Sequence, residues 1–135
     1  MQKVVYSLVL IYSISFNTSS QSYYFNNTYA TGELYSGAAS IVELDDGYMV
    51  LGRMLTSIDS KLILQKINFN GDSIWQKKFG NPPEIYFASD IYKLSDGNLI
   101  VSGSVKDTAG GMADFFLAKF DLDGDTIWTK RYGSD

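Results

Sequence analysis

The stretch KLILQKINFNGDSIWQKKFG, residues Lys61–Gly80, returns later in the chain as DFFLAKFDLDGDTIWTKRYG, residues Asp114–Gly133. At this offset of 53 residues, eight of the twenty positions are identical, whereas average residue usage gives about one or two matches by chance. Ala38–Gly47 and Ala88–Gly97 also match, with five identities in ten positions at an offset of 50. The offset grows by one at the Asp-Gly turn and by two more before Lys61. Insertions confined to turns are expected of one structural unit that occurs twice.

Each copy is expected to form four short antiparallel strands joined by tight turns. Gly and Asn at the turns tolerate the positive φ that twisted hairpins need. Four such strands in about 50 residues, repeated along a chain, are typical of propeller blades. We therefore predict an all-β fold with four-stranded antiparallel blades of β-propeller type, blade 1 at residues 35–80 and blade 2 at residues 81–135. In the second copy the expected strands are Ala88–Leu94, Leu99–Gly103, Asp114–Asp121 and Thr126–Tyr132.

Several strands are continuous apolar runs, which indicates that both faces of each sheet need cover, because a sheet with one wet face would alternate. Blades packed face to face provide that cover. Propellers close with about four to eight blades, so two units predict an incomplete ring whose last blade has an uncovered apolar face. Such a face indicates a partner, a missing continuation or an aggregation hazard. The interpretation we favour is a fragment of a longer protein; self-association through open faces is the expectation for a complete chain.

The first 34 residues carry two further predictions. Lys3 followed by the uncharged run Val4–Ile14 is typical of a signal peptide, here residues 1–22, and is too short to span a bilayer, which needs about 20 apolar residues. Residues 23–34 are expected to be an N-terminal strand from a partial repeat, because Phe25–Tyr29 lies over Trp75–Phe79 at an offset of 50.

The repeat resembles that of the secreted bacterial β-propeller-repeat proteins. Their units run approximately D-G-G-x-[IV]-[VL]-x-G and then D-x-[FY]-[LV]-x-K-x-D-x-x-G-x-x-x-W-x-[KR]-x-[FY]-G-G. Lys61 and Asn68 depart from the two Asp positions of the second motif. The resemblance implies an exported scaffold or adhesion-like module and identifies no active site. The matching residues are Asp46, Gly47, Gly52, Lys66, Gly71, Trp75, Lys77, Phe79 and Gly80 in the first copy, and Asp96, Gly97, Gly103, Asp114, Lys119, Asp121, Gly124, Trp128, Lys130, Tyr132 and Gly133 in the second.

Composition excludes several classes of function. The 135 residues include no Cys and no His, so disulfides, thiolate metal sites, thiol nucleophiles and Ser-His-Asp triads are ruled out. Eleven basic and fifteen acidic residues give a net charge of −4, the wrong sign for a nucleic-acid binder. We expect no cofactor and no nucleic-acid partner.

Asp121, Asp123 and Asp125 stand at alternate positions, as in the first part of a calcium loop. An EF-hand needs Gly at the sixth position and Glu at the twelfth, but here Gly124 is fourth and Tyr132 is twelfth. A hairpin turn explains both copies whereas calcium explains one, so the turn is favoured. The aligned residues of the first copy are Asn68, Asn70 and Asp72.

Trp75 and Trp128 recur at one position of the repeat, which favours a structural role between neighbouring sheets over a sugar-stacking platform. The carboxylate pairs Asp45/Asp46 and Glu84/Asp90 could serve acid–base chemistry in principle. No catalytic residue is assigned, because these acids occupy turn and loop positions where solvated carboxylates are the default.

The function predicted from the sequence is an exported, non-catalytic interaction scaffold for protein or glycan, located in the periplasm, on the cell surface or outside the cell. Two alternatives stay open. The chain could be the N-terminal part of an extracellular propeller enzyme acting on polysaccharide, or a small glycan-binding module.

Overall fold

The computed structural model describes residues 28–29 and 35–133, and these form eight β-strands and no helix. The all-β prediction is therefore confirmed. Every strand expected in the second copy is present, and the first of them begins four residues earlier, at Glu84. The strands are β1 Tyr35–Leu44, β2 Gly47–Leu55, β3 Ser60–Ile67, β4 Ser73–Phe79, β5 Glu84–Lys93, β6 Leu99–Asp107, β7 Asp114–Phe120 and β8 Thr126–Tyr132.

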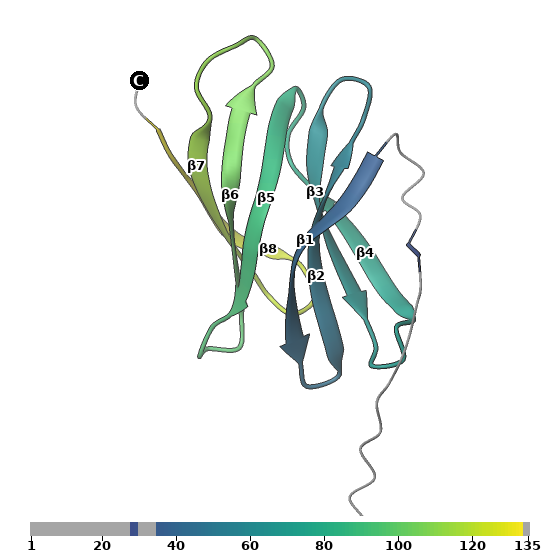
Figure 1. Ribbon diagram of the computed structural model, residues 1–135. Helices are drawn as coiled ribbons and strands as arrows, with labels where there is room; N and C mark the ends of the chain where they lie inside the picture. The colour runs from purple at the N-terminus through teal and green to yellow at the C-terminus, as the bar shows by residue number, and fades with distance from the viewer. Residues whose placement is uncertain (1–27, 30–34, 134–135) are drawn as a thin grey trace, which may run out of the picture.

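The strands pair antiparallel in chain order within two series, β1–β4 and β5–β8, which we call the first and second groups. The groups stand side by side (Figure 1), and one parallel bridge between Ser60 and Ile85 joins β3 to β5. Hydrogen bonds thus link all eight strands into one open, mixed sheet. This arrangement is less clearly divided than the separate four-stranded blades expected from the sequence.

Irregularities in the strand pairing fall at aligned positions of the two groups. A register shift between Ala38 and Ser40 in β1 corresponds to one between Ala88 and Asp90 in β5. Opposite the second shift, a Cβ on Gly103 would lie 2.2 Å from the carbonyl oxygen of Phe87. Only glycine permits so close an approach of two backbones.

Three turns share one hydrogen-bonded geometry, and each connects two paired strands. In the turn Asp121–Asp125, the Asp121 amide donates to the Asp125 carbonyl at 3.0 Å and the Gly124 amide donates to the Asp121 carbonyl at 3.2 Å. Gly124 has a φ of 80°, a left-handed conformation that favours glycine. The turns 68–72 and 94–98 repeat both bonds, so the Gly signals in the sequence correctly located these connections.

The two groups share one hydrophobic core, because each contributes buried side chains to the space between them. Phe79 packs edge-on against Tyr86 and Phe120, with ring centroids 5.9 and 5.2 Å apart. The Ser60 hydroxyl donates to the carbonyl of Tyr86 and accepts from its amide, both at 2.8 Å. The core consists of Leu44, Met49, Leu51, Leu62, Leu64, Tyr86, Ile91, Leu99, Val101, Val105, Phe116, Ala118 and Phe120.

The predicted signal peptide, residues 1–22, lies outside the described residues. Of the expected N-terminal strand, residues 23–34, only Thr28 and Tyr29 are described, and neither lies in a strand. In the described parts of the chain, no helix of the length and apolarity needed to cross a membrane occurs.

Candidate functional site

The second group has an apolar face that points away from the first group, and we call it the outer face of the second group. Its membership follows from strand register, since residues paired across antiparallel strands share a face. Tyr92 pairs with Ile100, Lys119 pairs with both Ile100 and Trp128, and the intervening Leu99, Val101 and Phe120 belong to the core on the opposite side. The apolar members of this outer face are Tyr92, Ile100, Phe115, Leu117, Trp128 and Tyr132.

This outer face is open to solvent. Tyr92 is 67% exposed, and Phe115 and Tyr132 are each 50% exposed. The rings of Phe115 and Tyr132 lie 6.1 Å apart. Exposed aromatic groups gathered on one face are typical of interaction surfaces.

Two lysines, Lys119 and Lys130, lie among the aromatic side chains on this face. Lys119 Nζ contacts Asp96 Oδ2 at 2.5 Å. This contact, together with the Asn98 amide that donates to the carboxylate, lowers the pKa of Asp96 to about 2. Lys130 Nζ lies 5.7 Å from the centre of the Trp128 ring, within range of a cation–π interaction. The face therefore offers aromatic surface with two positive charges, one neutralised by a carboxylate and one resting on a ring.

The two tryptophans differ in their surroundings, which corrects the expectation that both pack between sheets. Trp75 packs against the shared core, and a Cβ on Gly124 would lie 2.6 Å from its ring. Trp128 is half-buried on the outer face and is not among the residues packed on the core. Within the described part of the chain, Lys130 Nζ is the charged group that lies over its ring.

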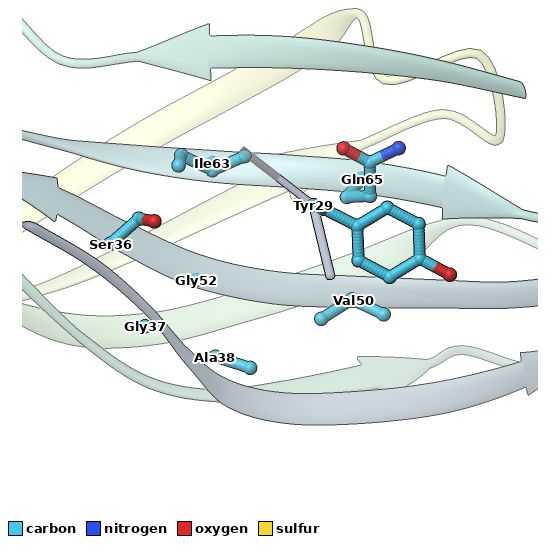
Figure 2. Close-up of a pocket in the computed structure, with 8 residues that line it drawn as sticks. All are labelled: Tyr29, Ser36, Gly37, Ala38, Val50, Gly52, Ile63 and Gln65. Atoms are coloured by element: carbon cyan, nitrogen blue, oxygen red, sulfur yellow. The ribbon is translucent and has the colours of Figure 1, made fainter. Parts of the chain in front are cut away.

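The first group also has an outer face, and it carries a shallow hollow of about 150 Å³. Figure 2 shows the Tyr29 ring beside Val50 and Gln65 in this hollow. The Tyr29 hydroxyl donates to the carbonyl of Gly71. Sequence comparison placed Tyr29 over Phe79 by an aromatic match alone and gave no indication of this hollow, whose lining is Tyr29, Ser36, Gly37, Ala38, Val50, Gly52, Ile63 and Gln65.

The carboxylates considered for calcium take part in a turn and an ion pair. Asp121 Oδ1 accepts the amides of Asp123 and Asp125 at 3.0 and 2.8 Å. Asp125 Oδ1 meets Lys77 Nζ of the first group at 2.5 Å. Among the described residues, no group of three or more acidic side chains is arranged to hold a metal ion. The geometry supports the hairpin-turn interpretation.

The carboxylates considered for acid–base chemistry each have a separate partner. Asp45 contacts Lys93 at 2.9 Å and Asp46 contacts Lys66 at 2.8 Å. Asp90 accepts the Ser40 hydroxyl at 2.5 Å. Each of these three carboxylates therefore makes a contact of its own at the surface.

Glu84 lies at a polar cleft of about 420 Å³ between the groups. It accepts the Tyr86 hydroxyl at 2.6 Å and pairs with Arg131 at 2.9 Å. Burial, and then the hydrogen bond to Glu84, raise the pKa of Tyr86 to about 12. No sequence pattern indicates this cluster, because Arg131 is 47 residues from Glu84.

A scan against protein-family models finds no match to this chain, and a search of curated proteins likewise finds no matching relative.

Proposed function

We propose that the chain is an exported, non-catalytic β-propeller-repeat segment that serves as an interaction scaffold through the outer face of the second group. The observation that carries the proposal is the exposed set of aromatic and aliphatic side chains on this face, chiefly Tyr92, Phe115 and Tyr132. The aligned side chains of the first group are covered by the second group. The same arrangement of apolar side chains on the outer face of the second group is therefore suited to packing against another surface.

The repeat assignment is supported by the aligned irregularities of the two groups. The shift at Ala38/Ser40 recurs at Ala88/Asp90, and the shift at Lys66/Ile67 recurs at Lys119/Phe120. The offsets, 50 and 53, are those of the sequence match. This agreement favours two copies of one four-stranded unit, as in propeller blades.

The test compares two substitutions on one strand. Trp128 lies on the outer face, whereas Thr129 pairs with the core residue Ala118, so it lies on the opposite side of β8, and it is exposed. Binding of the full chain is measured on a glycan array and to itself in solution. We expect Trp128→Ala to lose whichever binding the chain has, and Thr129→Ala to keep it.

Two results contradict the proposal. One is a chain that binds neither glycans nor itself. The other is binding that survives Trp128→Ala with unchanged affinity. Both substitutions change exposed or half-exposed side chains, and thermal melts check that each variant remains folded.

A further inference from the structure

We infer that the outer face of the second group receives the outer face of the first group from a second copy of this chain, so that copies stack head to tail. This inference rests on the proposed function and names the partner for that face. It follows from the way in which the two groups of one chain already pack.

The packing within the chain has a direction. The face of the first group that meets the second contains Leu62, Leu64 and Met49. The sequence aligns these with Phe115, Leu117 and Ile100, which lie on the open outer face of the second group. The inner face of the first group and the outer face of the second are therefore versions of one surface.

The outer face of the first group, which would receive the second copy, corresponds in the same way to the inner face of the second group. Val101, Phe116 and Ala118 of the second group pack into the shared core. The aligned residues of the first group are Val50, Ile63 and Gln65, and all three line the hollow on its outer face. Ile91 is 3% exposed inside the chain, whereas the aligned Ile41 is 55% exposed. Ile63 and Gln65 are only 5% and 6% exposed, so part of the receiving half is already covered within the chain. Each chain thus contains both halves of the contact that it makes internally, the outer half open and the receiving half partly covered.

Charge complementarity supports the same docking. The ion pair between Lys77 and Asp125 crosses the internal interface. The aligned residues are Lys130 and Asp72, which would meet across a contact between copies. In the described part of the chain, no ion pair holds Lys130, and Asp72 Oδ2 accepts a hydrogen bond from the side-chain Nδ2 of Asn68 at 2.9 Å.

A ring contact is preserved as well. Trp75 lies against Gly124 inside the chain, and the aligned pair is Trp128 and Gly71. By contrast, the internal pair of Lys93 and Asp45 aligns with Glu43 and Ser95. The contact between copies therefore lacks one ion pair and is weaker than the internal one.

Tyr29 lies where the second copy would dock. Its ring lies in the receiving hollow and its hydroxyl bonds to the carbonyl of Gly71, the residue that Trp128 of the incoming copy would approach. Tyr29 and the second copy therefore compete, and removing the Tyr29 ring should strengthen association.

The experiment measures association of the full chain by sedimentation velocity over a range of concentrations. We expect Tyr29→Ala to associate about tenfold more tightly than the unsubstituted chain. Lys130→Glu and Asp72→Lys should each weaken association about tenfold, because each sets like charges opposite one another. An equimolar mixture of these two variants should recover it, since every contact in the mixture can pair opposite charges. Asp123→Lys, in the aligned turn of the second group, is the charge-matched control and should leave association unchanged.

Three results overturn the inference. In the first, both the unsubstituted chain and Tyr29→Ala are monomers at every concentration. In the second, Asp72→Lys leaves association unchanged. In the third, the mixture of Lys130→Glu and Asp72→Lys fails to recover association. The second of these would indicate a symmetric contact of the outer face with itself. If association fails while glycan binding is lost in Trp128→Ala, the proposed function stands and only the second-copy inference falls.

Discussion

Leu64 and Leu117 occupy aligned positions, yet Leu64 is 1% exposed in the shared core whereas Leu117 is only partly buried on the outer face of the second group. The same contrast separates Val42, packed on the core, from Tyr92, which is 67% exposed. One surface pattern is therefore buried in the first group and open in the second. The difference lies in what stacks on each face, because the strand pairing beneath is the same.

The strongest test of this comparison is to replace each of the two leucines by alanine. Leu64→Ala should lower the free energy of unfolding by about 3 kcal/mol, since it empties part of a closed core. Leu117→Ala should lower it by about 1 kcal/mol or less, because its side chain already meets water. Urea denaturation of the full chain measures both. Equal losses would show that the outer face is covered in solution.

A second comparison uses two glycines with the same backbone conformation. Gly124 and Gly97 have φ of 80° and 84°, so an alanine at either is strained by about 1–2 kcal/mol. A Cβ at Gly124 also collides with Trp75, whereas a Cβ at Gly97 meets no atom within 4 Å. Gly124→Ala should therefore be the more destabilising by about 1 kcal/mol. Indistinguishable melting temperatures would contradict the contact between Trp75 and the second group.

The interface between the two groups should also make the free energy of unfolding fall at alkaline pH, because it contains Tyr86. Its pKa is raised to about 12, above the ordinary value of about 10 expected in the unfolded chain. The contribution to stability is complete below pH 10 and is lost as the pH rises toward 12, because the unfolded chain gives up the proton first. Denaturation at stepped pH should show this decline, and Tyr86→Phe should flatten it.

The smallest expected effect is on the turn beside the open face. Lys119 lowers the pKa of Asp96 to about 2, so the contribution of this carboxylate is present above about pH 4 and is lost as the pH falls toward 2. NMR titration of the Asp96 carboxyl should give the lowered value, and Lys119→Ala should raise it. Asp46 in the first group, whose pKa Lys66 lowers, should stay unchanged in that variant.

The strands and turns were predictable because their signals are local. Asn70-Gly71 and Asp123-Gly124 mark turns whose glycines indeed have positive φ, and the apolar runs fall within strands. The parallel bridge from Ser60 to Ile85 depends on tertiary packing that no local pattern encodes.

The candidate site was predictable only as a class of surface. An uncovered apolar face follows from two copies of a unit that needs cover on both sides. The different surroundings of Trp75 and Trp128 could not be predicted, because both lie in the same local sequence pattern. The Tyr29 contact and the Glu84–Arg131 pair join residues 42 and 47 positions apart, and neither residue type alone indicates such a partner.

The directional stacking of the two groups has a geometric consequence. When the outer face of one second group binds the outer face of the next first group, one face of each kind stays unbound at the two ends, however many copies are added. No finite straight stack therefore satisfies all of its faces. Such a series ends only by curving into a ring, or it continues as a filament. The rotation between β1–β4 and β5–β8 is then the quantity that selects between a closed particle of fixed size and an endless polymer.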